Sequence, residues 1–258
     1  MGRLDGKVVL ISGAAKGQGA TEAIMFASEG AKIVFGDILD EEGLKIESQI
    51  REFGGEATYV HLDVTQEADW NKAVHTAVDN YGVLDVLVNN AGVGMGFESL
   101  ASAVLIHIDC TLDTNIRATI HSVRAVLPSM IERNTGHIVN IGSMAGLYPL
   151  SSAVYGASKG GLHVLSMDLR LELQGTGVRV TEICPGRVRT EFYDAALDTP
   201  KERQRAKDSG IEELTSEDIA ASVIYALDAP WRVNVNRIEL QPTEQIYGGL
   251  QFTPRESR

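Results

Sequence analysis

The sequence predicts an α/β fold: a doubly wound parallel sheet of about seven strands with helices on both faces. Short apolar runs alternate with helical patterns along the chain, as expected for repeated strand–helix–strand units. The first apolar run, Val-Val-Leu-Ile at residues 8–11, ends in a loop with three glycines, and a helical pattern follows. No linker or internal repeat interrupts these units, so residues 1–258 are expected to form a single domain.

The predicted strands are short, apolar runs, several of them rich in β-branched residues, and are expected to be buried. They are expected at residues 8–11, 32–37, 57–61, 84–89, 136–141, 178–184 and 236–240. Helices are expected at residues 20–29, 41–53 and 67–81, within 101–133, from Tyr155 to about Leu173, and at 216–227 with Ser216 as N-cap. The polar residues 191–213 are predicted to form a mobile segment beside the substrate. In a parallel sheet, ligands bind beyond the carboxyl ends of the strands, so residues there are the candidates for a site.

The loop Ser12-Gly-Ala-Ala-Lys-Gly-Gln-Gly19 is suited to holding a phosphate group. Between a strand and a helix, backbone N–H groups and the helix N-terminus can bind a pyrophosphate. Gly13 would permit the tight turn, and Gly17 and Gly19 would let the cofactor and the strand approach closely. An ordinary strand-to-helix turn is the alternative, but three glycines in so short a loop favour a Rossmann-type dinucleotide-binding fold.

Asp37 ends the second predicted strand, where a carboxylate can accept hydrogen bonds from the adenosine ribose hydroxyls of a dinucleotide. A strand-end Asp is also a common helix cap, a role that Asp40 could take instead. Ile38 follows Asp37, so no adjacent basic residue offsets its repulsion of the 2′-phosphate of NADP. Lys16 acts in the opposite direction from the glycine loop. The balance predicts NAD as the cofactor, with NADP second.

Tyr155 and Lys159 lie four residues apart in a predicted helix and therefore share one face. Free tyrosine titrates at about pH 10, but a nearby positive charge lowers the pKa of the phenol toward the range of proton exchange with an alcohol. Ser143 follows the strand at 136–141 and could hydrogen-bond the same substrate oxygen. Because a Tyr and a Lys at this spacing also occur on ordinary amphipathic helices, the interpretation depends on the rest of the chain.

The composition argues against several kinds of function. The formal net charge of −12 argues against binding to nucleic-acid phosphates, and no apolar run reaches the ~20 residues of a membrane-spanning helix. The first residues lack the apolar core of a signal peptide, so a cytoplasmic location is expected. Cys110 and Cys184 are predicted to be reduced thiols, and neither they nor the six histidines have the spacing of a metal site.

In combination, these residues resemble the classical short-chain dehydrogenase/reductase family from Gly6-Lys7 to Leu240. The motifs that carry the resemblance are Ser12-Gly-x-x-x-Gly-x-Gly, Asn89-Asn-Ala-Gly, Asn115, Ser143, Tyr155-x-x-x-Lys159 and Pro185-Gly. The resemblance implies that a nicotinamide dinucleotide is bound by Gly13, Lys16, Gly17, Gln18, Gly19, Asp37, Ile38, Asp63, Val64, Asn90, Ala91, Gly92, Tyr155, Lys159, Pro185 and Gly186, with Val188 and Thr190 at the carboxamide.

The same resemblance implies a mechanism. Tyr155 would exchange a proton with the substrate oxygen that Ser143 holds and polarises. Lys159 would lower the pKa of Tyr155 and bind the nicotinamide ribose, and Asn115 would anchor a water that links Lys159 to solvent.

The residues expected around the substrate are mostly apolar: Gly94, Met95, Phe97, Ser143, Leu147, Tyr148 and Tyr193. Arg187 and Arg189 could bind a substrate carboxylate, or could equally be surface or inter-subunit charges. Members of the family assemble through the helices that carry Asn115 and Tyr155, so a homotetramer, or failing that a homodimer, is expected. Its contact faces would carry Ile120, Val123, Leu165 and Leu169.

Some positions depart from the family pattern. Ser12 and Gln18 replace the usual Thr and aliphatic residue, Ser143 and Tyr155 lie one residue closer than usual, and the apolar run 103–108 lies where members begin a polar helix. The sequence predicts an NAD-dependent oxidoreductase that interconverts a secondary alcohol and a ketone. Two alternatives stay open. One is an NADP-dependent 3-hydroxy-acid dehydrogenase, because residues 236–245 are similar to that subgroup, and the other is a catalytically silent protein that senses the dinucleotide.

Overall fold

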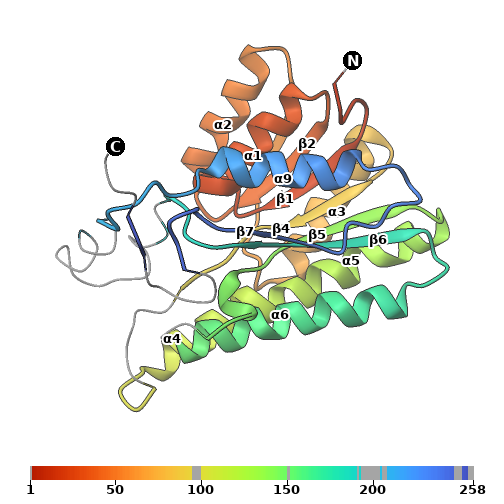
Figure 1. Ribbon diagram of the computed structural model, residues 1–258. Coiled ribbons are helices and arrows are strands. Elements are labelled where there is room, and N and C mark those ends of the chain that lie inside the picture. Colours follow the sequence, from red (N-terminus) through yellow and green to blue (C-terminus); the bar gives the residue numbers. More distant parts are fainter. Residues whose placement is uncertain are drawn as a thin grey trace.

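The computed structural model contains a seven-stranded parallel sheet, which confirms the predicted fold class (Figure 1). It describes residues 2–94, 100–149, 152–190, 192, 204, 208–246 and 252–254. The strands are β1 (Val8–Ser12), β2 (Lys32–Asp37), β3 (Glu56–His61), β4 (Val86–Asn89), β5 (Gly136–Ile141), β6 (Val178–Pro185) and β7 (Arg237–Leu240). Their order, β3-β2-β1-β4-β5-β6-β7, reverses between β1 and β4. In sheets of this kind a crevice for ligands opens at such a reversal, beyond the carboxyl ends of the strands.

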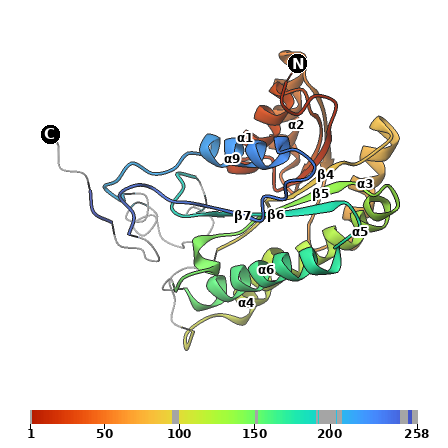
Figure 2. The same cartoon turned by 45° about the vertical axis from the view of Figure 1, so that its right-hand side comes forward.

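Helices cover both faces of the sheet (Figures 1 and 2). One face carries α1 (Gly17–Ser28), α2 (Asp40–Glu52) and α9 (Ser216–Asp228). The other carries α3 (Glu67–Tyr81), α4 (Leu105–Leu112), α5 (Ala118–Glu132) and α6 (Ala153–Glu172). A short 3-10 helix, η2 (Met144–Gly146), lies between β5 and α6. None of the helices in the described part of the chain combines the length and the apolar character needed to cross a membrane.

The surroundings of β1 explain why its first four residues are all apolar. Val9 and Ile11 pack into the core on the side of α1 and α9, whereas Val8 and Leu10 pack into the core with α3, α5 and α6. All four side chains are buried, because side chains alternate between the two faces and helices cover both. A central strand of this kind places the loop that follows it at the middle of the sheet edge.

The helical stretch predicted within residues 101–133 is not uniform. Between α4 and α5 the chain forms a π-helical segment, η1 (Asp113–Arg117). π-helical turns hold more residues per turn than an α-helix and are frequent at functional sites. Asn115 lies in this segment and is buried. The apolar spacing of the sequence continues through it, so the pattern predicted a helix without revealing the change of geometry.

The predicted cap of α9 was wrong by one residue. The N-cap is Thr215, not Ser216, because Thr215 and Asp218 form a capping box: the Asp218 N–H donates to Thr215 Oγ1 and the Thr215 N–H donates to Asp218 Oδ2. Asp40 is likewise not a cap. It is the first residue of α2, and its carboxylate bonds side chains of β3 instead.

The outward faces of α5 and α6 carry different residues from those predicted. Ile120 is exposed as expected, but Val123 and Leu169 are buried and Leu165 packs against the core. The exposed apolar side chains of α6 are Val164, Met167 and Leu171. The apolar run 103–108 also reaches the surface, since Val104, Leu105 and Ile106 are exposed.

Candidate active site

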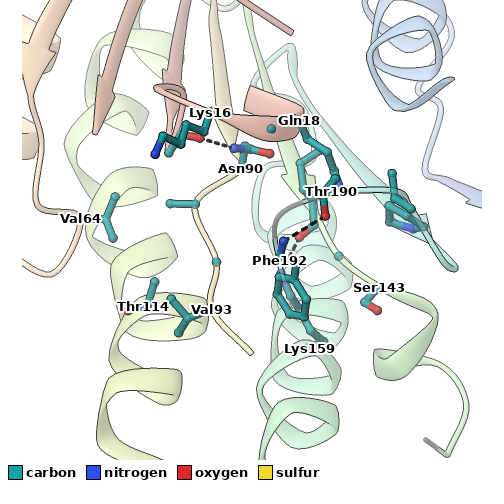
Figure 3. Close-up of a pocket in the computed structure, with 18 of the residues that line it drawn as sticks. Lys16, Gln18, Val64, Asn90, Val93, Thr114, Ser143, Lys159, Thr190 and Phe192 are labelled. Atoms are coloured by element: carbon teal, nitrogen blue, oxygen red, sulfur yellow. Dashed lines mark hydrogen bonds between the residues drawn. The ribbon is translucent and has the colours of Figure 1, made fainter. Parts of the chain in front are cut away.

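A cavity of about 700 Å³ lies beyond the carboxyl ends of the strands (Figure 3). It brings together most of the residues singled out in the sequence, although they come from distant parts of the chain. Those on its wall are Gly13, Lys16, Gly17, Gln18, Asp37, Ile38, Asp63, Val64, Asn90, Ala91, Gly92, Ser143, Tyr155, Lys159, Pro185, Gly186, Arg187, Val188 and Thr190. Figure 3 shows Lys16, Gln18 and Asn90 at one end, and Ser143, Lys159 and Phe192 at the other.

Gly13 and Gly19 of the glycine loop are packed so closely that a side chain would not fit at either position. A β-carbon on Gly13 would lie 2.7 Å from Cα of Ala91, and one on Gly19 would lie 2.4 Å from the carbonyl oxygen of Gly13. The Asn90 side-chain amide donates to the carbonyl oxygens of Ser12 (3.0 Å) and Gly13 (2.8 Å) and fixes the loop to β4. The loop therefore presents backbone and the N-terminus of α1 to the cavity, and this surface fits a pyrophosphate. Gly19 does not line the cavity; it allows the start of α1 to pack closely against Gly13.

Asp37 lies at the end of β2 with its carboxylate oriented by backbone donors. Oδ2 accepts from the Ala15 N–H (3.1 Å) and Oδ1 accepts from the Leu39 N–H (3.2 Å). Ile38 beside it is exposed. Lys16, the nearby cation of the glycine loop, forms an ion pair with Glu42 of α2 (3.5 Å). The carboxylate is thus fixed at the cavity wall, while the ammonium group is drawn toward another acid.

Asp63 has a local structural partner. Its Oδ1 accepts from the Thr65 N–H (3.0 Å) and from the Thr65 hydroxyl (2.7 Å), and its own N–H donates to Asp69 (3.0 Å). These bonds shape the turn between β3 and α3. Val64, the residue after Asp63, lines the cavity (Figure 3).

Lys159 is the buried charge of the site. Its side chain is only 5% exposed, and its ammonium group donates to the carbonyl oxygen of Ile141 at the end of β5 (2.8 Å). Burial lowers the pKa of Lys159 from 10.5 to about 8, because water no longer solvates the charged form. Tyr155 lies one helical turn earlier on the same helix and lines the same cavity. The Phe192 ring packs against the Tyr155 ring with their centroids 5.7 Å apart.

Ser143 lines the cavity from the segment between β5 and η2. It is the N-cap of η2, where its Oγ accepts from the Ala145 N–H (3.1 Å). A hydroxyl group that accepts this bond keeps its own hydrogen for donation. The capping bond fixes the orientation of the Ser143 side chain.

Asn115 supports the site from behind its wall. Its Oδ1 accepts from the Val93 N–H (2.8 Å), and its amide group donates to the Val93 carbonyl (2.8 Å) and to Ser158 Oγ (3.0 Å). Gly92 lies on the wall next to Asn115: a β-carbon there would lie 3.3 Å from Asn115 Oδ1 and 3.5 Å from Lys159 Nζ. Both amide hydrogens of Asn115 are therefore used to tie the loop after β4 to α6.

The predicted substrate residues are only partly brought together. Met95, Phe97 and Tyr193 lie outside the described residues. Among the described residues on the cavity wall, Gly94, Leu147 and Tyr148 do not occur. The hydroxyl of Tyr148 donates instead to Glu239 of β7 (3.3 Å). Of the predicted substrate residues that the structure describes, only Ser143 therefore lies on the cavity wall.

The two arginines after β6 differ in environment. Arg187 is buried, its guanidinium bonds Glu213, and its backbone N–H donates to Gln245 (2.9 Å). Arg189 is exposed. If Arg187 bound a substrate carboxylate, that carboxylate would compete with Glu213 for the guanidinium group.

Several wall residues were not predicted as site residues, among them Thr114, Phe192 and Gln245. Gln245 comes from the segment after β7, and its side-chain oxygen lies so close to Gly186 that a β-carbon there would be 2.5 Å away. Such residues reach the site through tertiary packing of distant segments.

Comparisons with known proteins agree with this geometry. The family model described as short chain dehydrogenase matches residues 7–201. The NADP-dependent 3-hydroxy acid dehydrogenase YdfG of Salmonella typhi is 36% identical over 94% of this chain and 98% of its own. The 3-alpha-(or 20-beta)-hydroxysteroid dehydrogenase of Mycobacterium bovis is 43% identical over 75% of this chain and 73% of its own. The closed form of serine dehydrogenase complexed with NADP+ matches with a TM-score of 0.88 and 34% identity, over 96% of this chain and 100% of that chain.

The match to the family model covers both the glycine loop and the Tyr155–Lys159 pair, and the structure places these groups on one cavity. The related proteins are dehydrogenases with different substrates, so they agree on the chemistry and not on the molecule it is applied to. The chain belongs to the short-chain dehydrogenase/reductase family and is an NAD(P)-dependent oxidoreductase.

Proposed function

We propose that this protein interconverts a secondary alcohol and a ketone with NAD, using Tyr155 as general acid and base. The observation that carries the proposal is the common cavity of Tyr155, Lys159 and Ser143. When bound, the dinucleotide supplies or accepts the hydride. A single dinucleotide-binding and catalytic domain over residues 1–258 is part of the proposal.

The roles follow from the contacts of each side chain. Ser143 donates its hydroxyl hydrogen to the substrate oxygen and orients it toward Tyr155, which gives or takes the proton. The Lys159 ammonium group, one turn away, stabilises the phenolate form of Tyr155. Asn115 is a positioning residue that holds Val93 and Ser158 around this group. The water that was predicted to connect Lys159 to solvent stays part of this proposal.

The preference for NAD rests on the residues of this chain. Asp37 is fixed at the wall where it can accept hydrogen bonds from ribose hydroxyls, and Ile38 supplies no cation. A 2′-phosphate at ~4 Å from the carboxylate would be repelled by about 4 kcal/mol at an effective dielectric constant of 20. Lys16 could offset this repulsion, but it is paired with Glu42. Several relatives are NADP-dependent or were solved with NADP+, which makes the cofactor the first part of the proposal to test.

One experiment tests cofactor and substrate class together. The values of kcat/KM are measured with NAD and with NADP over a panel of neutral alcohols, ketones, hydroxysteroids and 3-hydroxy acids. We expect higher values with NAD and with neutral substrates. A higher value with NADP would mean that Lys16 dominates over Asp37, and no turnover on any substrate would support a protein that only senses the dinucleotide.

The second candidate is an NADP-dependent 3-hydroxy-acid dehydrogenase. It is favoured by the name of the relative that is 36% identical over 94% of this chain. The pairing of Arg187 with Glu213 speaks against it, because the buried guanidinium already has a carboxylate partner. Turnover of 3-hydroxy acids at rates above those of the matched neutral alcohols would establish this alternative.

We also propose that the protein is a cytoplasmic homotetramer, or failing that a homodimer. The proposed contact face consists of the exposed apolar residues Leu105, Ile106, Ile120, Val164, Met167 and Leu171 on α4, α5 and α6. Burial of such side chains contributes about 25 cal/mol per Å², so a continuous apolar face favours association. Light scattering at micromolar concentration tests this, with Leu171→Glu, in which a charge interrupts the face, expected to shift the distribution toward monomer. A monomer in the unmodified protein would contradict the proposal.

A further inference from the structure

Tyr59 of β3 contacts the segment that carries Asp37. Its hydroxyl lies 2.7 Å from the main-chain carbonyl oxygen of Asp37 and 2.8 Å from Oδ1 of Asp40. Asp37 ends β2 and Asp40 begins α2, so both acceptors belong to one short turn. The hydroxyl hydrogen can be donated to either oxygen, and each choice ties this turn to β3.

The ring of Tyr59 has a built place between two elements. It packs edge-on against Phe35, its partner in the β2–β3 register, with centroids 5.5 Å apart. On α2, Gly43 leaves the space that the ring fills, since a β-carbon there would lie 2.1 Å from the ring. Burial and the neighbouring Asp40 carboxylate raise the pKa of the hydroxyl, so Tyr59 stays protonated and acts as a donor.

Asp37 is held by donors from four separate positions. The Ala15 and Leu39 N–H groups fix its carboxylate, as described above. Its carbonyl oxygen accepts from the Leu62 N–H (3.0 Å) and from the Tyr59 hydroxyl. The backbone bonds set the direction of the carboxylate, and Tyr59 is the one side chain among these four donors. A substitution can therefore remove the Tyr59 contact while the other three remain.

His61 supports this arrangement from the far side. Its Nδ1 lies 2.8 Å from the same Oδ1 of Asp40 that Tyr59 contacts. The pair lowers the pKa of Asp40 and raises the pKa of His61, so Asp40 stays an ionised acceptor. Tyr59, Asp40 and His61 together form a network outside the cavity that fixes the turn bearing Asp37.

We propose that Tyr59 is a positioning residue for discrimination between the two nicotinamide dinucleotides. It holds the Asp37 turn where the carboxylate accepts hydrogen bonds from two ribose hydroxyls and opposes a 2′-phosphate. The inference rests on the proposed role of Asp37, and it concerns cofactor binding alone. Without the hydroxyl, the turn can shift away from the ribose, which weakens the contacts to NAD and relieves the repulsion of NADP.

The test compares Tyr59→Phe, which keeps the ring against Phe35 and Gly43, with the matched control Tyr81→Phe. The Tyr81 ring is also half-buried at β2, but it lies beneath Lys32 at the opposite end of that strand. The dissociation constants of NADH and NADPH are measured by fluorescence titration. In Tyr59→Phe we expect the Kd of NADH to rise about fivefold, the usual effect of one lost hydrogen bond, while that of NADPH stays the same or falls. Turnover at saturating cofactor should stay within about twofold, and Tyr81→Phe should change neither constant.

The outcome that decides is the ratio of the two dissociation constants, NADPH over NADH. A ratio that is equal in Tyr59→Phe and the unmodified protein overturns the inference. So does an equal weakening of both cofactors, which would indicate a general loss of structure. If Tyr59→Phe folds poorly, Asp40→Asn provides a second variant of the same network and should lower the ratio in the same direction. If the unmodified protein prefers NADPH, the proposed cofactor is wrong, yet the change of ratio still tests Tyr59.

Discussion

The two ends of the cavity hold their polar groups in opposite ways. At the end proposed to hold the adenosine, Asp37 is half-buried, and its carboxylate accepts from the Ala15 and Leu39 N–H groups, so its charge is compensated by nearby dipoles. At the nicotinamide end, the Lys159 ammonium is almost completely buried, and its bond to the carbonyl of Ile141 does not prevent a fall of its pKa to about 8. The first arrangement suits recognition of a fixed ligand. The second keeps a charge in an unfavourable place, where it can act on a neighbouring proton.

The largest expected effect is at the nicotinamide end. Tyr155→Phe should lower kcat at least about 100-fold, the low end of the effect of losing a general acid, and leave the Kd of NADH unchanged within about twofold. The matched control is Tyr148→Phe, because the Tyr148 hydroxyl bonds Glu239 and does not line the cavity. Single-turnover kinetics with both variants would show the contrast, and near-normal chemistry in Tyr155→Phe would remove this residue from its role.

A second prediction concerns the cost of the buried charge. A fall of the Lys159 pKa from 10.5 to about 8 corresponds to roughly 3 to 4 kcal/mol, at ~1.4 kcal/mol per pKa unit. As the pH falls from 10.5 to 8, the unfolded chain takes up a proton that the folded chain refuses, so folded stability is lost, and below pH 8 the loss is complete. Lys159→Met should therefore stabilise the protein at pH 7.

The net gain should be on the order of 2 kcal/mol, since the lost bond to Ile141 offsets about 1 kcal/mol. It should vanish above pH 10.5, where the lysine is neutral in both states. Urea unfolding at pH 7 and at pH 11, with Lys45→Met on the surface of α2 as control, measures this difference. A destabilised Lys159→Met at pH 7 would mean that the ammonium group contributes more to folding than its burial costs.

The adenosine end gives the smallest of the three effects. Asp37→Ser combined with Ile38→Arg replaces a carboxylate by a cation at the wall, so the ratio of kcat/KM for NAD over NADP should fall at least about tenfold, or ~1.4 kcal/mol. Ile38→Leu is the control, because it changes neither charge. An unchanged ratio in the double variant would contradict the role of Asp37, and Lys16→Ala would then show whether Lys16 sets the preference.

The sequence predicted the adenosine end better than the substrate wall, for a physical reason. The glycines and Asp37 act through backbone geometry that recurs wherever a strand, a tight loop and a helix meet, so their spacing carries information. The Tyr155–Lys159 spacing is equally local. By contrast, Phe192 and Gln245 reach the wall through the packing of segments that are far apart in the chain. The hydroxyl of Tyr148 bonds Glu239 of β7 instead of lining the wall.

Element boundaries differed for local reasons. The strand predicted at residues 84–89 begins at Val86, because Leu84 is buried without belonging to the sheet and Asp85 accepts the N–H of Val8. An apolar pattern reports burial and does not report sheet pairing. The cap of α9 moved to Thr215 because a capping box with Asp218 competes with the isolated Ser216.

The π-helical segment between α4 and α5 accommodates one residue more than an α-helical turn would hold, because its hydrogen bonds close one residue later. Deleting one residue from Asp113–Arg117 would convert the segment into an ordinary α-helical turn and leave α4 nearly in phase with α5, so Cys110 on α4 would keep its place on the cavity wall. The residues of the segment itself, Thr114 on the wall and Asn115 behind it, would be displaced instead. The extra residue thus sets the position of Asn115 independently of the helices on either side.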